Sequence, residues 1–343
     1  MGCLGMKMSA STVSAGYAHG LLKYAILRGA DEQQMLNIAD LKSADFADPD
    51  NRISMQKYVK LTRGAKKLCN SPALALEFCD DTRFEKLSVV GLICQSAPNM
   101  GEVLKQLSRY SKLVAEVDLG QEEERFDVVP MQDGLWIVDN RKSPNEFIEL
   151  TEGTFGRFIC EFRRHFGEVP FALQVHVTHS KPDYHSEYEK ILQVPVTFDS
   201  DKNAMQIDPN WLAVEVAPAN EYLFGVLAQR GDSLLKDLEE SGTLAAKISK
   251  IILPKLHTGE VNMDDVAQSL GQSRQTLYRK LKAEETTFDA LLDQLRHKMA
   301  RHYLEGKKVS ANETAYLLGF ADPSSFSRAF KRWTGATPGS YRG

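Results

Sequence analysis

The side chains best suited to specific chemistry lie near the C-terminus, on one face of a predicted helix that begins after Ser273. Its outward positions hold Arg274, Gln275, Tyr278 and Arg279. In the major groove of DNA, arginine makes two parallel hydrogen bonds to guanine, and glutamine can do the same to adenine. The residue types and their helical spacing therefore predict that this helix reads base edges.

The neighbouring sequence supplies a scaffold for this helix. A shorter helix expected over 263–270 ends in Leu-Gly, and Gly271 permits the tight turn that follows. Ser273 is a suitable N-cap for the second helix, because its hydroxyl can accept a hydrogen bond from a free backbone amide. Leu277 and Leu281 are four residues apart and face the first helix. This is the pattern of a helix-turn-helix.

A second copy of the pattern lies about 48 residues further on, over 313–332. Its first helix also ends in Leu-Gly. Asp322 is the expected N-cap of the next helix, and Pro323 takes the first helical position, where its missing N–H costs nothing. Phe326 and Phe330 form the inward stripe. The outward base-reading candidates of this helix are Ser324, Ser325 and Arg328.

A helix expected over 288–305 connects the two copies. Its 18 residues span about 27 Å at ~1.5 Å per residue, and successive major-groove segments lie ~34 Å apart. The helix is long enough for one subunit to read two such segments.

The candidates for phosphate contacts are Ser273, Lys280, Lys282, Ser327, Lys331 and Arg332. The first copy is richer in base-reading side chains, so we expect it to discriminate bases and the second to position the backbone. A plain helical bundle also contains Leu-Gly turns, but two capped copies with a connecting helix favour DNA binding.

Charge is distributed unevenly along the chain. Residues 243–343 contain 16 Lys and Arg against 10 Asp and Glu, whereas the complete chain contains 42 against 46 and has a net charge of −4. The C-terminal part is therefore basic and the remainder is acidic. A basic part joined to an acidic body indicates a polyanionic partner for that part alone, and double-stranded DNA fits both the charge and the motif.

The preceding sequence predicts a domain of another kind. Up to residue 115 the apolar spacing is mostly helical, and Ser54 is a plausible N-cap for a helix over 55–68. Further on, β-prone runs and turn signals predict short strands, with hairpins over 125–139 and 194–207. The expected fold class is an α+β N-terminal domain with a small sheet, followed by an all-α C-terminal domain with two helix-turn-helix units joined by a helix.

Other chemistry is not indicated. The five cysteines contain no Cys-x-x-Cys, no apolar run approaches the ~20 residues that span a bilayer, and no signal peptide is evident, so we expect a cytoplasmic protein without membrane contact. No phosphate-binding loop or nucleophile motif occurs, and we expect no catalytic residue, cofactor or metal. His176, His179 and His185 lie near Asp183, but the first two would face opposite sides of a strand and its exit.

Several motifs extend these interpretations. Residues 315–320 read Ala-Tyr-Leu-Leu-Gly-Phe, residues 326–338 read Phe-Ser-Arg-Ala-Phe-Lys-Arg-Trp-Thr-Gly-Ala-Thr-Pro, and Tyr341-Arg342 follows. Together they resemble the C-terminal signature of AraC/XylS-type transcription regulators. The resemblance implies base contacts by Gln275, Tyr278 and Arg279 and by Ser324, Ser325 and Arg328. Pro323 departs from the polar residue often found there, which argues against a base contact at that position.

Shorter motifs in the N-terminal part resemble one branch of the same family, whose sensor domain is called arabinose-binding-like. They are Asp48–Ile53, Arg109-Tyr110, His179–Pro182 and Pro195–Phe198. The name does not imply that arabinose is the effector, because this branch is tied to varied effectors.

The sequence thus predicts a DNA-binding transcription regulator that responds to a small-molecule effector. We expect residues 1–16 to be poorly ordered, 17–238 to bind effector and form a homodimer, 239–242 to be a linker, and 243–343 to bind DNA. Activation through RNA polymerase follows from the resemblance alone. Two alternatives are an architectural DNA-binding protein without effector and an enzyme domain fused to a DNA-binding domain. The effector candidates are Phe126, Trp136, Phe171 and Phe198, although aromatic residues at such positions are more often plain core.

Overall fold

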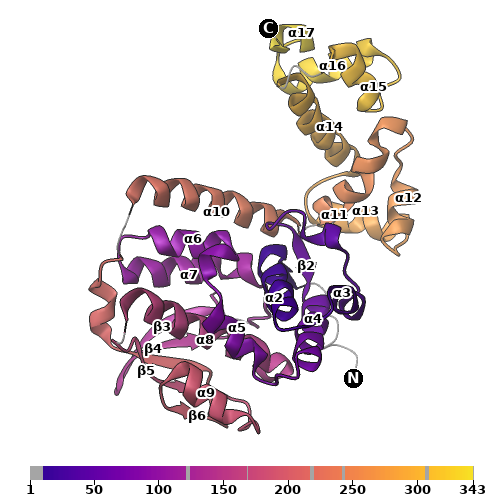
Figure 1. Ribbon diagram of the computed structural model, residues 1–343. Helices are drawn as coiled ribbons and strands as arrows, with labels where there is room; N and C mark the ends of the chain where they lie inside the picture. Colours follow the sequence, from indigo (N-terminus) through magenta and orange to yellow (C-terminus); the bar gives the residue numbers. More distant parts are fainter. Residues whose placement is uncertain are drawn as a thin grey trace. The chain divides into compact units, whose positions relative to one another are not determined.

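The computed structural model describes residues 11–120, 124–167, 169–216, 220–241, 244–305 and 309–342. Its contacts separate an N-terminal unit, up to Leu235, from a C-terminal unit that begins at Lys236 (Figure 1). The expected α+β and all-α fold classes are confirmed for the two units. No helix within the described ranges is both long and apolar enough to cross a membrane. Residues 1–10 of the expected disordered segment and Gly242 of the expected linker lie outside these ranges.

The N-terminal unit contains α-helices of 8 to 21 residues together with short 3₁₀ turns. The α-helices are α2 (Ala15–Leu27), α3 (Glu32–Ala39), α4 (Met55–Leu68), α5 (Leu74–Asp81), α6 (Val89–Ser96), α7 (Met100–Val114), α8 (Ile148–Phe166), α9 (His185–Leu192) and α10 (Glu221–Ser241), the last of which continues past Leu235 into the C-terminal unit. The 3₁₀ turns are η1 (Ser43–Phe46), η2 (Phe84–Lys86), η3 (Pro144–Phe147) and η4 (Pro209–Ala213). Ser54 caps α4 as expected, because its hydroxyl accepts from the Lys57 amide at 3.4 Å. α10 continues through residues 239–241, so the described part of the expected linker is helical.

The expectation that the chain is poorly ordered up to residue 16 is wrong from Thr12 onward. Thr12–Ser14 forms β1, which pairs antiparallel with β2 (Arg52–Ser54). The Arg52 side chain holds the pair in place, since its Nε donates to the Thr12 hydroxyl at 2.8 Å and its Nη2 to the Lys112 carbonyl at 3.0 Å. These contacts join residues far apart in the chain, and local composition does not reveal them.

The larger sheet has the strand order β3-β4-β7-β5-β6. Its strands are β3 (Phe126–Met131), β4 (Gly134–Asp139), β5 (Ala172–His176), β6 (Val196–Thr197) and β7 (Ala204–Ile207). β3 and β4 form the expected hairpin, with Met131 paired to Gly134 across the turn. The second expected hairpin is wrong, because β5 lies between β6 and β7. The loop after β6 crosses the end of β5, where the Ser200 amide donates to the Val177 carbonyl at 3.0 Å.

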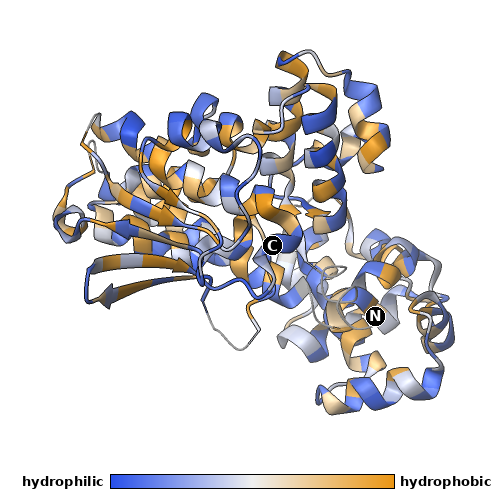
Figure 2. Cartoon of the chain, turned by 90° about the horizontal axis from the view of Figure 1, so that it is seen from below, coloured by the Kyte–Doolittle hydropathy of each residue, from blue (hydrophilic) through white to orange (hydrophobic). Residues whose placement is uncertain are grey.

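α8 packs against α5 and α9, and its aromatic side chains reach the sheet through a shared buried core. The ring of Phe162 stacks on Phe171, beside β5, with centroids 3.4 Å apart. Phe158 meets Phe126 of β3 edge to face at 5.5 Å. Figure 2 shows apolar stretches along the strands and helices that meet in this core. The helix thereby ties the sheet to the helical part of the unit.

The C-terminal unit is entirely helical over its described residues. Its elements are α11 (Leu244–Ile252), η5 (Leu253–Thr258), α12 (Met263–Ser269), α13 (Arg274–Ala283), α14 (Phe288–Glu305), α15 (Ala311–Leu317), α16 (Pro323–Thr334) and α17 (Pro338–Arg342). Leu277 and Leu281 of α13 and Phe326 and Phe330 of α16 belong to one buried cluster. Each has at most 1% of its surface exposed, so the inward stripes predicted for both second helices are confirmed.

Candidate nucleic-acid interface and sensor cavity

The first helix-turn-helix unit consists of α12 and α13. Asn262 caps α12 by accepting from the Asp265 amide at 3.0 Å. Gly271 takes the left-handed conformation, with φ of 64°, that the turn requires. Ser273 then caps α13 by accepting from the Thr276 amide at 3.2 Å, as its sequence position predicts. Local capping thus sets where the candidate recognition helix begins.

The second unit consists of α15 and α16. Ser310 and Glu313 form a reciprocal capping box at the start of α15, with bonds of 3.2 and 2.7 Å. Gly319 has φ of 70°, and Asp322 caps α16 with Pro323 at the first helical position, as expected. The turn at Gly319 packs closely against the backbone of η5. A Cβ added to Gly319 would lie only 2.1 Å from the Leu256 carbonyl oxygen. This turn has no room for a side chain.

α14 connects the two units and contacts the second one through Arg296. The Arg296 Nε donates to the Leu318 carbonyl at 3.0 Å, and its Nη2 donates to the Gly319 carbonyl at 3.3 Å. Its guanidinium also lies over the Phe320 ring, 4.8 Å from the centroid. One arginine therefore anchors the turn of the second unit to the connecting helix.

The structure places the predicted base-reading residues of α13 on its exposed face. Tyr278 is 57% exposed, although tyrosine is an amphipathic residue that usually packs at least in part. The exposed predicted residues of this unit are Ser273, Arg274, Gln275, Tyr278, Arg279, Lys280 and Lys282. In the second unit Ser324, Arg328, Lys331 and Arg332 are exposed, whereas Ser325 and Ser327 are half-buried.

Some of these side chains already have partners within the protein. The Arg274 guanidinium lies 2.7 Å from the Asp264 carboxylate. The Ser325 hydroxyl donates to Asp322 at 2.7 Å, so it serves the helix cap. Arg332 pairs with Asp293 of α14. Arg279 has no ion pair among the described residues. Of the two arginines on α13, Arg279 is therefore the one whose guanidinium is free to contact a DNA base.

A cavity of about 120 Å³ lies inside the N-terminal unit, between α2, α6, α7, β3 and α8. Its apolar wall is formed by residues that include Phe84, Val90, Val103, Leu107, Phe126 and Phe158. Tyr17, Arg125, Thr154, Arg157 and Glu161 also belong to the lining, which is mostly apolar. Buried, mainly apolar cavities with a few polar groups are typical of small-molecule sites. We refer to it as the sensor cavity.

Only one of the four predicted effector residues, Phe126, lines the sensor cavity. Trp136 and Phe171 are buried in the core, and Phe198 packs against His179 and Tyr188. Strand position alone does not distinguish a cavity wall from plain core, since both are apolar. The sequence missed the helical wall, although Arg157 and Glu161 on α8 lie beside the aromatic pair at 158 and 162 with the same four-residue spacing.

One arginine of the sensor cavity belongs to the Asp139 cluster, which consists of Arg125, Asp139 and Arg141. Arg125 Nη2 and Arg141 Nε lie 3.3 and 2.9 Å from Asp139 Oδ2. Arg125 Nη2 also donates to the Thr154 hydroxyl at 2.8 Å. Burial alone would raise the pKa of Asp139, but the two guanidinium groups hold it below its ordinary value. The cluster is therefore ionised at neutral pH.

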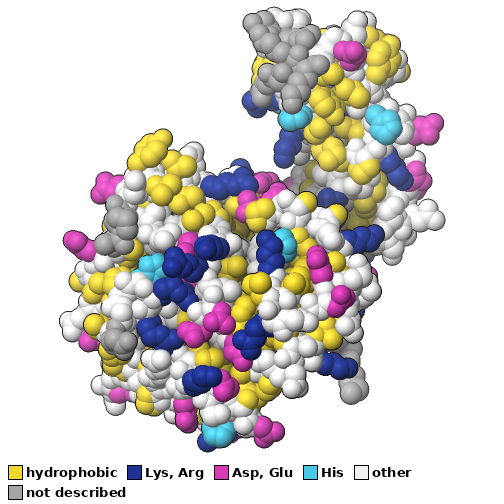
Figure 3. All heavy atoms as spheres, viewed as in Figure 1, with side chains coloured by type: hydrophobic (Ala, Val, Ile, Leu, Met, Phe, Trp, Pro, Cys, Tyr) yellow, Lys and Arg dark blue, Asp and Glu magenta, His cyan; other side chains and the backbone are white. Residues whose placement is uncertain are grey.

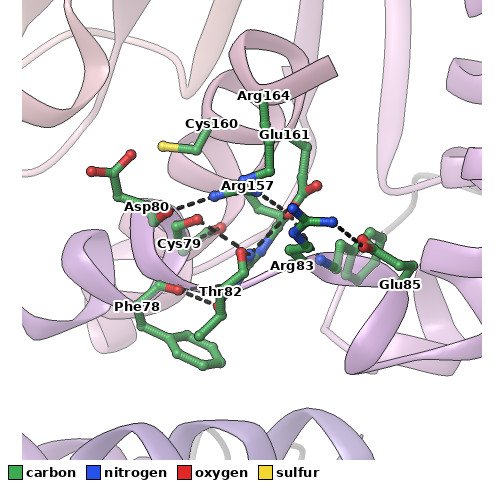
Figure 4. A network of polar contacts seen from close by, with 12 residues as sticks. Phe78, Cys79, Asp80, Thr82, Arg83, Glu85, Arg157, Cys160, Glu161 and Arg164 are labelled. Atoms are coloured by element: carbon green, nitrogen blue, oxygen red, sulfur yellow. Dashed lines mark hydrogen bonds and ion pairs between the residues drawn. The ribbon is translucent and has the colours of Figure 1, made fainter.

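The second arginine belongs to the Glu161 cluster, which consists of Arg157, Glu161 and Arg164 (Figure 4). Arg157 Nη1 and Arg164 Nη1 lie 3.1 and 2.8 Å from Glu161 Oε1. Arg157 also donates to backbone carbonyls at the end of α5, namely Phe78 at 3.3 Å, Cys79 at 3.3 Å and Thr82 at 2.5 Å. Its Nε is buried without a hydrogen-bond partner among the described residues.

The histidines near Asp183 have hydrogen-bond roles. His179 Nδ1 lies 3.0 Å from the Ser180 carbonyl and its Nε2 lies 3.1 Å from the Tyr188 hydroxyl. His176 contacts Ser200 at 3.2 Å. Across the described ranges, no group of three or more His, Cys, Asp or Glu side chains is arranged to hold a metal ion.

Comparison with known proteins agrees with both units. Residues 29–216 match the arabinose-binding N-terminal domain of AraC transcription regulators, and residues 266–343 match a helix-turn-helix domain. The chain is 24% identical over 341 residues to the ornithine utilization regulator of Pseudomonas aeruginosa, which is 98% of each chain. It is 36% identical over 110 residues to the transcriptional activator RhaS of Escherichia coli, covering 31% of this chain and 38% of RhaS.

The crystal structure of the transcriptional regulator CdpR from Pseudomonas aeruginosa is 22% identical, with a TM-score of 0.41 over 90% of this chain and 96% of CdpR. Both relatives are named as transcription regulators. The N-terminal match spans more than half of the sequence, and the helix-turn-helix match begins within α12 and continues through α17. This chain belongs to the AraC family of DNA-binding transcription regulators, with the family's ligand-binding domain at its N-terminal end.

Proposed function

We propose that this protein is an effector-responsive transcription activator that reads two successive major-groove segments with α13 and α16. The observation that carries the proposal is the exposed polar face of α13. Gln275, Tyr278 and Arg279 are exposed there, while Leu277 and Leu281 are buried against the rest of the unit. A capped helix that presents such side chains with its N-terminal half outward is arranged for the major groove.

The two units have different roles in this proposal. α13 offers Arg279, Gln275 and Tyr278 for base edges, while Lys280 and Lys282 contact phosphates. In α16 the Ser325 hydroxyl is engaged with Asp322. The second unit therefore depends on Ser324 and Arg328 for bases and contributes more to backbone contacts through Ser327, Lys331 and Arg332. Ser273 and Arg274 complete the first unit's contacts at the start of α13.

The test compares Arg279→Ala with Lys280→Ala on DNA selected from a random pool by the full chain. Arg279→Ala should weaken binding to the selected site by about 1–3 kcal/mol and relax specificity at one base pair. Lys280→Ala should weaken selected and random DNA alike and lower the slope of log affinity against log salt by about 1. Equal losses on both DNAs for Arg279→Ala would show that this residue does not read bases.

The sensor cavity supports the effector part of the proposal over an architectural DNA-binding protein. Its walls come from α6 and α7, and α7 is joined to α10 by polar contacts. The Tyr110 hydroxyl donates to Asp232 at 2.6 Å and to the Ala228 carbonyl at 3.1 Å, and Arg109 pairs with Asp232 at 2.7 Å. α10 crosses the boundary between the units. Effector binding would act by shifting an existing equilibrium of this connection.

Homodimerisation is supported by an exposed apolar face on α10. Tyr222, Leu223 and Val226 are 84%, 46% and 47% exposed, and hydrophobic side chains gather over the start of this helix in Figure 3. Contiguous exposed apolar surface is typical of interaction sites. Val226→Lys should convert the dimer to a monomer in light scattering, and an unchanged mass would exclude this face.

Activation, through contact with RNA polymerase, is supported by the relative named as an activator.

A further inference from the structure

The two charged clusters at the sensor cavity each carry excess positive charge. The Asp139 cluster and the Glu161 cluster both contain two guanidinium groups and one carboxylate. Arg125, Asp139 and Arg157 are each less than 10% exposed. Charge that is buried without compensation is expensive. An anion in the cavity between these clusters would therefore be stabilised by both.

The cavity also contains hydrogen-bond donors suited to such an anion. The Arg157 Nε–H is buried and makes no hydrogen bond that meets normal geometry among the described residues, and the Tyr17 hydroxyl is the polar group that faces this guanidinium. The remaining guanidinium nitrogens of Arg157 are held by α5 and Glu161, so the side chain cannot turn to find another partner. Tyr17 lines the same cavity, and burial raises its pKa to about 12, so its hydroxyl keeps its proton and can donate.

The volume of the cavity indicates which apolar groups fit it. The cavity measures about 120 Å³, and a cavity of ~150 Å³ lined by Leu, Ile and Phe is sufficient for benzene. Val90, Val103 and Leu107 supply the same kind of wall. A single small ring or a short branched chain is therefore an apolar group that fits this space.

From the clusters, the buried Arg157 Nε and the apolar wall, we infer that the sensor cavity binds a small monocarboxylic acid with a compact apolar body. The carboxylate accepts hydrogen bonds from Arg157 and Tyr17, and the body lies against α6 and α7. This inference rests on the proposed sensing function and names the chemical class of the effector.

The test measures thermal shifts of the full chain with benzoate, phenylacetate and isovalerate, each beside its uncharged amide. We expect a saturable shift with at least one acid and a dissociation constant at least about tenfold weaker for the matching amide, because the amide loses the charge-assisted hydrogen bond. Equal binding of acid and amide overturns the inference, and so does the absence of a saturable shift with all three acids.

Gly153 provides a variant that blocks the cavity without changing either cluster. It lines the cavity from α8, and a Cβ added there would meet only the Tyr17 hydroxyl within 4 Å, at 3.8 Å. Gly153→Leu should fold, since glycine in a helix interior is unfavourable, and should abolish the acid-dependent shift. Gly153→Ala is the matched control and should retain binding. Binding that persists unchanged in Gly153→Leu overturns the site.

Failure of this inference and failure of the proposed function give different results. If neutral compounds bind the cavity and alter DNA affinity, the protein remains a sensor and the carboxylate class is wrong. If Arg279→Ala leaves DNA recognition unchanged, the proposed DNA reading fails, whatever binds in the N-terminal unit.

Discussion

Glu152 allows a sharp test of how burial controls charge in the N-terminal unit. It lies on α8 and is 2% exposed. Its Oε1 accepts hydrogen bonds from the Tyr184 and Tyr188 hydroxyls, both at 2.7 Å. Its Oε2 is buried without a hydrogen-bond partner among the described residues. Burial raises the pKa of Glu152 to about 7, against the lowering effect of the two tyrosine hydroxyls and Lys66.

The raised pKa determines the direction of the pH dependence. The folded protein holds the Glu152 proton at pH values where the unfolded chain has already lost it, so the free energy of unfolding falls as pH rises. This contribution is complete below the ordinary pKa of 4.5 and is lost by the time pH passes about 7. At about 1.4 kcal/mol for each tenfold change in the ionisation constant, the loss is about 3 kcal/mol.

The perturbation is Glu152→Gln, which keeps an acceptor for both tyrosines and resembles the protonated acid. Urea unfolding of both proteins is measured between pH 5 and pH 8. The variant should gain about 2–3 kcal/mol of stability relative to the wild type between pH 5 and pH 8. Burial lowers the pKa of nearby His179, which makes stability fall toward acid pH. Both proteins share that effect, so it cancels in the difference.

The refuting result is a stability difference between wild type and Glu152→Gln that stays constant from pH 5 to pH 8. It would mean that Glu152 titrates alike in the folded and unfolded chains, and that its burial is compensated by groups other than the two tyrosines.

Two further predictions concern turns and coupling. Gly319→Ala should destabilise the C-terminal unit by about 3 kcal/mol or more, because strain at positive φ is joined by a clash with backbone, whereas Gly271→Ala meets nothing within 4 Å and should cost about 1 kcal/mol in denaturant unfolding. Equal costs would contradict the packing of the second turn. Tyr110→Phe removes two hydrogen bonds to α10 and should raise amide exchange over residues 221–235 about fivefold, at ~1 kcal/mol. Tyr222→Phe, at an exposed site, is the control and should leave exchange unchanged.

The C-terminal unit could be predicted closely because its signals are local. Ser273 and Asp322 cap the helices that their positions predicted, and Leu277 and Phe326 are buried as their spacing required. Caps and four-residue stripes depend on neighbours within one or two turns. The base-reading and phosphate roles remain predictions, although most of these side chains are exposed.

The N-terminal unit was predicted less well because its arrangement depends on distant pairings. The expected hairpin over 194–207 is wrong, since β5 inserts between β6 and β7. β1 exists through its pairing with β2 and the reach of Arg52. A short run of β-prone residues does not indicate which strand will be its neighbour.

The sequence by itself determined the family, the two fold classes and which face of α13 is exposed, because capping residues, helical spacing and a long ordered motif are all local. Only the tertiary structure decided where a ligand can bind. The sensor cavity is built from α2, α6, α7, β3 and α8, and its polar groups Arg125 and Arg157 come from separate elements. A cavity is the space left between side chains distant in sequence, and its charge balance depends on which of them the fold brings together.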